Sequence, residues 1–246
     1  MEKNMKDILK DLVAHSHSLG FIDCIKITGT DNATVIEAIS ERAVIIQGET
    51  IKPATELKGK FGMPNLNKLD LHLKNPEYKD NAKINLEWGI RNGENRPVSI
   101  VFENNTGDFK NEYKLMSSEM ADTKVASVKF NGTNWNIDFE PSVTAIARLK
   151  LQAAAHSEET VFTVKTDKDC LNIFFGDANS HEGNFTFQSG ITGKLRQTWM
   201  YPVSHFISVL NLDGDKTIKF SDDGVALITI NSGLAKYNYY FPSQTK

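Results

Sequence analysis

The stretch MPNLNKLDLHLKN, residues 63–75, carries Leu66, Leu69 and Leu73. Spacings of three and four residues place these leucines on one face of an α-helix. The stretch that lies 137 residues later, MYPVSHFISVLNL (200–212), has the same apolar spacing, in Val203, Phe206 and Leu210. We therefore predict one short amphipathic helix at matching positions in each half of the chain.

The offset of 137 residues extends beyond these two helices. It also aligns Leu9 with Ile146, Leu12 with Leu149, Ile25 with Phe162 and Ile27 with Val164. The first pairs belong to a predicted helix in MKDILKDLVAHSHS (5–18) and to a third helix that Pro141 opens, since proline is tolerated in a first turn. So many coincidences at one offset indicate an internal duplication.

Short alternating runs, bounded by Gly, Asp and Asn, fill the rest of the chain and are typical of antiparallel strands. In the first half they are residues 21–28, 34–39, 42–49, 55–61, 82–88, 96–103 and 109–116. The second half closes with 216–222, 225–231 and 235–241. We predict an α+β protein of two similar domains, 1–116 and 124–246, joined by a polar connector at 117–123.

The composition is that of a folded, water-soluble protein. Of the 246 residues, 40% are apolar and 24% are charged, and no stretch is long and apolar enough to span a membrane. The start MEKNMKDILK lacks the apolar core of a signal peptide, so we expect a cytoplasmic location. Cys24 and Cys170 lie in apolar runs without metal-ligand spacing, which predicts reduced thiols.

Sequence motifs of catalysis and cofactor binding are missing. The sequence contains no nucleophile elbow, phosphate loop or dinucleotide fingerprint, so we expect neither an enzyme nor a cofactor. His15 and His17 are two residues apart at a helix end and have no accompanying Cys or carboxylate cluster, so we expect no metal site.

The net charge of −3 argues against a protein that binds nucleic acid over its whole surface. The distribution of charge matters more, because Lys3, Lys6 and Lys10 form a stripe opposite the apolar face of the first helix.

The duplicated plan, together with four stretches, resembles the DNA sliding clamps, which include proliferating cell nuclear antigen and the processivity clamps of tailed bacteriophages. The stretches are LKDL (9–12), NLNKLDLHLKN (65–75), NEYKLMSSE (111–119) and LAKYNYYFP (234–242). The resemblance covers essentially the whole chain in order, and the short connector favours a phage-type clamp.

The resemblance implies a DNA-clamp fold in which each domain packs two helices on antiparallel sheets. Two-domain subunits would assemble as a homotrimer into a ring of pseudo-sixfold symmetry, with the helices on the inner rim. Such a ring encircles double-stranded DNA, tethers the DNA polymerase as a processivity factor, and is loaded by a clamp-loader ATPase. A phage-encoded clamp would work in the cytoplasm of the host cell.

The resemblance also implies a DNA-binding set on the inner helices. Lys3, Lys10 and Lys74 match family positions that bear pore lysines, and Lys6, Lys68, Arg148 and Lys150 are neighbours of the same kind. The fourth helix departs from the pattern, because it offers only His205, with Lys216 beyond it. The alternative is that these cations form an ordinary solvated helix face.

A partner-binding pocket is implied as well. The terminal strand would supply Tyr239, Tyr240, Phe241 and Pro242 as one wall, and the connector region would supply Leu115, Met116 and Met120 as another. Alternate rings of the strand would then face the core, and the sequence leaves open which of Tyr239 and Tyr240 does so. By the same resemblance, the strand at 109–116 would pair with an edge strand of the next subunit within 171–188.

Two other functions remain open on the sequence. One is a structural or interaction protein that has a clamp-like fold but does not encircle DNA. The other is a hydrolase on an α+β scaffold, which would need a pocket of convergent polar residues that the sequence does not show.

Overall fold

The computed structural model describes residues 5–41, 43–91, 93–125, 132–177, 179 and 181–244. These residues form two compact units. The first contains residues 5–41, 45–125 and 232–237, and the second contains 43–44, 132–231 and 238–244 among those described. Lys3, one of the predicted DNA-binding residues, lies outside the described residues.

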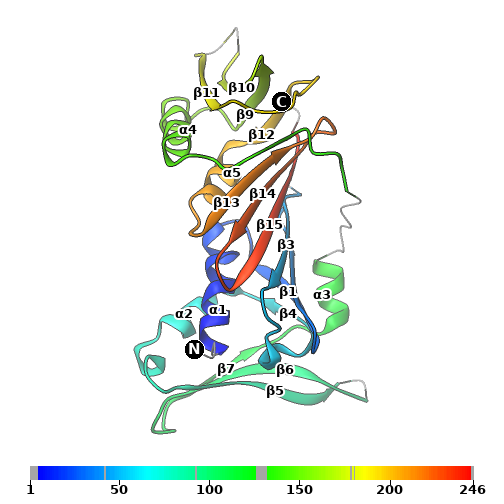
Figure 1. Cartoon of the computed structure of the whole chain (residues 1–246). Helices are drawn as coiled ribbons and strands as arrows, with labels where there is room; N and C mark the ends of the chain where they lie inside the picture. The colour runs from blue at the N-terminus through cyan, green and yellow to red at the C-terminus, as the bar shows by residue number, and fades with distance from the viewer. Residues whose placement is uncertain are drawn as a thin grey trace. The chain divides into compact units, whose positions relative to one another are not determined.

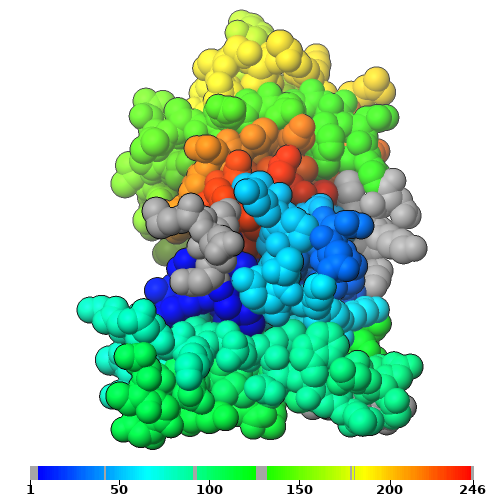
Figure 2. Space-filling model, turned by 60° about the horizontal axis from the view of Figure 1, so that its bottom comes forward, coloured from blue at the N-terminus to red at the C-terminus, as the bar shows by residue number. Residues whose placement is uncertain are grey.

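The first unit contains three α-helices, three short 3-10 helices and seven strands among its described residues. They are α1 (Met5–Ala14), η1 (His17–Leu19), β1 (Cys24–Gly29), β2 (Thr34–Ile39), β3 (Ile45–Thr50), η2 (Thr55–Leu57), β4 (Gly59–Pro64), α2 (Leu66–Lys74), η3 (Pro76–Tyr78), β5 (Lys83–Arg91), β6 (Glu94–Glu103), β7 (Lys110–Lys114) and α3 (Ser118–Lys124). The strands lie in the orders β4-β1-β2-β3 and β5-β6-β7. Figure 1 shows α1 beside α2, and Figure 2 brings the broad face of β5-β6-β7 forward.

The second unit repeats this plan. Its elements are β8 (Ile137–Phe139), α4 (Val143–Ala155), β9 (Val161–Asp167), β10 (Cys170–Phe175), β11 (Gly183–Ser189), β12 (Trp199–Pro202), α5 (Val203–Leu210), β13 (Asp215–Phe220), β14 (Val225–Asn231) and β15 (Ala235–Pro242), of which the first residues of β15 belong to the first unit. The strand orders are β12-β9-β10-β11 and β8-β13-β14-β15. Every strand pair whose register is described is antiparallel.

The elements of the two repeats begin at matching positions. Helix α2 begins at Leu66 and α5 at Val203, 137 residues later, while β1 begins at Cys24 and β9 at Val161 with the same offset. The apolar positions that define α2 and α5 are buried in both units. The predicted α+β fold of two similar halves, each with two helices on antiparallel sheets, is confirmed.

Three local predictions need adjustment. Residues 55–61 are not one strand, because a 3-10 turn occupies Thr55–Leu57 before β4 begins at Gly59. Pro141 does not open the third helix; Ser142 caps it, accepting a hydrogen bond from the Ala145 amide, and α4 begins at Val143. The predicted connector contains helix α3, capped by Ser117.

The cores of the two units differ in the size of their side chains. Helix α2 buries leucines, whereas α5 buries Phe206, whose ring lies 5.1 Å from those of Phe162 and Phe241. None of the described helices is both long and apolar enough to cross a membrane.

Candidate nucleic-acid interface and partner surface

In the first unit, α1 packs against α2, with the apolar face of each helix buried. Lys6 and Lys10 are four residues apart, so they lie on one side of α1. Lys10 is exposed, whereas Lys6 is half-buried and donates hydrogen bonds to the backbone carbonyls of Tyr78 and Lys79. Of this pair, only Lys10 projects its charge into solvent.

Helix α2 carries two of the predicted cations. Lys68 is exposed. Lys74 is exposed too, but its ammonium lies 2.5 Å from the carboxylate of Asp70, one turn earlier. This exposed i,i+4 pair offsets part of the positive charge that Lys74 would present to a phosphate.

In the second unit, α4 packs against α5 and against β11. Arg148 and Lys150 are both exposed. Because successive helical residues are about 100° apart, the two side chains leave α4 in roughly opposite directions. Burial lowers the pKa of the Lys216 ammonium, and the positive charge of Lys150 acts in the same direction. Lys150 and Lys216 therefore lie near one another, which the sequence alone did not reveal.

The terminal strand β15 alternates between buried and half-exposed residues. Tyr237, Tyr239 and Phe241 are buried, while Tyr240 and Pro242 are half-exposed. Partial burial raises the pKa of the Tyr240 phenol. The question of parity is thus answered: Tyr239 faces inward and Tyr240 faces outward.

The chain end runs past residues that the sequence did not single out. The Ser243 amide donates to the Gly224 carbonyl, and the Gln244 amide donates to the Met200 carbonyl. Gly224 is required here, because its φ is +78° and a Cβ would lie 2.9 Å from the Trp199 ring. The buried Trp199 Nε1 has no hydrogen-bond partner among the described residues.

The other predicted wall is built on α3 and the residues before it. Leu115 is buried, Met116 is half-buried, and Met120 is 60% exposed. Met116 is held against β4 by two backbone hydrogen bonds with Gly62, of 2.8 and 3.0 Å. Of the three residues, Met120 on α3 offers the most apolar surface to solvent.

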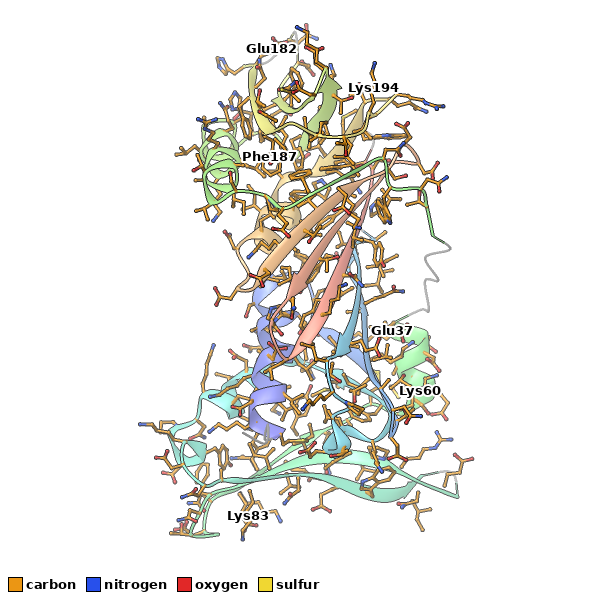
Figure 3. The ribbon with its side chains drawn as sticks, in the orientation of Figure 1. Glu37, Lys60, Lys83, Glu182, Phe187 and Lys194 are labelled. Atoms are coloured by element: carbon orange, nitrogen blue, oxygen red, sulfur yellow. The ribbon has the colours of Figure 1, made fainter. Side chains whose placement is uncertain are left out.

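A buried lysine fixes α3 to the sheet. Lys26 on β1 is 2% exposed, and its ammonium lies 2.7 Å from Glu37 of β2 and 3.4 Å from Asp122 of α3. Asp122 also pairs with Lys60 of β4 at 2.5 Å, and this hydrogen bond holds the pKa of the Asp122 carboxyl below its usual value. Figure 3 labels Glu37 and Lys60 on the side of the unit where α3 lies.

A second ionic contact holds the first turn of α3. Arg96 on β6 donates to Glu119 and to Glu94, and also to the Ser118 hydroxyl at 3.0 Å. The hydrogen bond from Arg96 lowers the pKa of Glu119 to about 2. These contacts, with the buried Ala121, leave Met120 on the outer face of the helix.

The predicted pocket takes its two walls from different units. Leu115, Met116 and Met120 belong to the first unit, and Tyr239, Tyr240, Phe241 and Pro242 belong to the second. Each wall is therefore described by itself.

Groups suited to metal binding or catalysis were sought in the described part of the chain. It contains no cluster of three or more His, Cys, Asp or Glu side chains placed to hold a metal ion. His15 instead stacks on Tyr237 with ring centroids 4.4 Å apart, and its Nδ1 lies 3.4 Å from Asp11. The Tyr237 hydroxyl donates to the same carboxylate at 2.8 Å, so this group of residues joins α1 to the start of β15.

No protein-family model matches the sequence, and no curated protein matches it either. Solved structures, in contrast, are similar over nearly the whole chain. The PCNA of Thermococcus kodakaraensis has a TM-score of 0.66 at 13% identity, and the match covers 98% of both chains. The PCNA of A. fulgidus, in a structure with the C-terminal region of FEN-1 bound, gives 0.64 at 12% identity, covering 98% of this chain and 95% of that one.

A third similar structure is the proliferating cellular nuclear antigen of Entamoeba histolytica. Its TM-score is 0.64 at 14% identity, over 98% of this chain and 94% of that one. The resemblance that the sequence motifs indicate is confirmed at the level of the fold. The chain has the fold of the PCNA sliding clamps.

Proposed function

We propose that this protein is a DNA sliding clamp, a non-enzymatic processivity factor that encircles duplex DNA and tethers a replicative DNA polymerase. The observation that carries the proposal is the likeness to PCNA structures over 98% of the chain, which includes both repeats. A clamp-loader ATPase would open and place the ring. If the protein is phage-encoded, this would take place in the host cytoplasm.

The proposed DNA-facing residues are cations of the helices in both repeats: Lys3, Lys6, Lys10, Lys68, Lys74, Arg148 and Lys150. Lys10, Lys68, Arg148 and Lys150 are exposed, and Lys216 adds charge beside Lys150. A sliding ring needs a diffuse positive field rather than tight contacts, because each phosphate must be left as easily as it is met. The local pairing of Lys6 and Lys74 suits such a weak field.

The experiment that tests this function compares retention on nicked circular and linear DNA after loading. An encircling clamp stays on the circle and is lost from the ends of the linear form. Replacing Lys10, Lys68 and Lys74 with Ala should reduce loading and retention while the fold persists. The matched control replaces Lys52, Lys58 and Lys194, also exposed. Equal loss of the unmodified protein from both DNA forms would exclude encirclement.

We place the partner site on the predicted pocket residues Leu115, Met116, Met120, Tyr239, Tyr240, Phe241 and Pro242. The exposed Met120 and the half-exposed Tyr240 and Pro242 would contact the partner, and the buried members would support them. Adaptable Met beside rigid rings suits a site for several partners. The A. fulgidus PCNA structure, which holds the C-terminal region of FEN-1, supports partner docking on this fold. Tyr240→Ala should weaken polymerase binding without unfolding the protein.

Ring closure is proposed through strands β7 and β11. Both are outer strands in the sheet orders β5-β6-β7 and β11-β10-β9-β12, so pairing between copies would satisfy two edges. The chain supplies a precedent for such pairing. β3, the counterpart of β11, lies beside β15, and the Ile51 amide just after β3 donates to the Leu234 carbonyl.

A clamp-like protein that does not encircle DNA is the second candidate. The local partners of Lys6 and Lys74 favour it, since they reduce the free charge on α1 and α2. The retention experiment separates the two candidates, because only an encircling protein distinguishes a circle from a linear duplex.

A further inference from the structure

Strand β5 begins the β5-β6-β7 sheet and has no described strand on its outer side. Its counterpart in the second repeat is β13, which is likewise the first strand after the second helix of its repeat. The outer side of β13 is covered by β8, with Phe139 opposite Ile218 and Ile137 opposite Phe220. The same edge is therefore paired in one repeat and open in the other.

A groove of about 430 Å³ lies along the start of β5. Its walls include Met5 and Lys6 of α1, Tyr78 and Lys79 after α2, and residues 83–85 of β5. Figure 3 labels Lys83 at this end of the sheet. In an edge strand, alternate N–H and C=O groups point away from the neighbouring strand, so the groove follows backbone that can pair with another strand.

Three lysines give this groove a positive character. Lys6, Lys79 and Lys83 line it, against the single carboxylate of Glu56. Burial lowers the pKa of the Lys6 ammonium, and in the described part of the chain its hydrogen-bond partners are two backbone carbonyls. Lys83 lies 3.3 Å from Glu103. A carboxylate entering the groove would therefore meet ammonium groups that are incompletely neutralised.

The covered edge of the second repeat shows what kind of strand fits such a place. β8 reads Ile137-Asp138-Phe139, with an acidic residue between two apolar ones. Its Asp138 carboxylate pairs with Lys219 of β13 at 2.6 Å. Apolar side chains on one face and an acidic side chain on the other suit an edge strand rich in lysine.

We propose that the β5 edge is a docking site for an extended segment of a partner protein with an apolar–acidic–apolar pattern, which adds a strand beside β5. Backbone hydrogen bonds would supply affinity, and the lysines around the groove would select the acidic residue. This proposal is independent of the DNA-clamp function, since it concerns a different sheet edge from those assigned to ring closure.

The test uses a capped peptide with the sequence of residues 136–141, NIDFEP, added to the full-length protein and followed by amide NMR. We expect saturable binding, with shifts concentrated at residues 79–85. Lys79→Glu should weaken binding about tenfold, the usual effect of losing a charge-assisted contact. Lys52→Glu, an exposed lysine outside the groove, should leave binding unchanged.

Backbone methylation of the peptide tests strand addition directly. Methylation of alternate amides, at Ile137 and Phe139 or at Asp138, should abolish binding for one pattern only, because alternate amides point toward the partner strand.

Three results would overturn the proposal. The first is absence of binding at about 1 mM peptide, the weak end of useful affinities. The second is a set of shifts at β13, which would mean that the peptide replaces β8. The third is binding that occurs only after residues 1–4 are removed, which would assign the groove to this chain's own start.

Discussion

Leu69 of α2 and Phe206 of α5 occupy matching positions in the two repeats, and both are fully buried. Phe206 packs in a cluster of rings with Phe162 and Phe241, whereas the position matching Phe162 is Ile25. The buried Ala38 of β2 likewise corresponds to the buried Phe175 of β10. The backbone plan is therefore kept with quite different side-chain volumes, provided that neighbouring positions change with them.

The outer faces of the matching strands differ as well. Lys26 on β1 is buried under α3 and pairs with two carboxylates, while its counterpart on β9, Thr163, is half-buried. The difference arises because α3 packs on β1. The first repeat thus replaces part of its apolar packing with an ionic contact to the connector helix.

Truncating the two matching core residues should give the largest effect. Phe206→Ala is expected to lower the free energy of unfolding by about 3–5 kcal/mol, and Leu69→Ala by about 2–5 kcal/mol. Urea denaturation followed by hydrogen exchange in α5 and α2 reports each unit separately. A loss below about 1 kcal/mol for Phe206→Ala would show that the aromatic cluster contributes little packing.

Removing the buried ammonium should give an intermediate effect. Lys26→Met leaves Glu37 and Asp122 without their shared cation, but their side chains are 27% and 40% exposed. Water can solvate them, so we expect a loss of about 1–3 kcal/mol in the free energy of unfolding. The matched change in the other repeat, Thr163→Val, should cost less than about 1 kcal/mol. Equal effects would remove the contrast between the two faces.

Acid should loosen α3 with the smallest effect. The pKa of Glu119 is lowered to about 2 in the folded protein, so its contribution is present above its ordinary pKa and is lost as the pH falls through about 2. The methyl resonance of Met120, one residue further on, should follow this titration, while that of Met200 should not. A midpoint at the ordinary glutamate value would show that Arg96 does not hold Glu119.

The repeat and the fold class could be predicted because they depend on apolar spacing, which the sequence displays directly. The burial of Lys26 could not, because strand alternation places it opposite Ile25 and Ile27, on a face that would be solvated if α3 did not cover it. The alternation of β15 was predictable but its phase was not, since rings stand at Tyr237, Tyr239, Tyr240 and Phe241. Local partners of Lys6 depend on the distant Tyr78 and Lys79 carbonyls, which no motif encodes.

Native mass spectrometry at micromolar concentration tests most directly the claim that this chain forms a closed ring. Our account predicts a species of three times the 27.5 kDa chain mass. Asn184→Pro and Phe185→Pro remove successive amides of β11. One of the two should dissociate the trimer while its monomer stays folded, because alternate amides face away from β10. A monomeric unmodified protein, or trimers that survive both substitutions, would contradict ring closure through this edge.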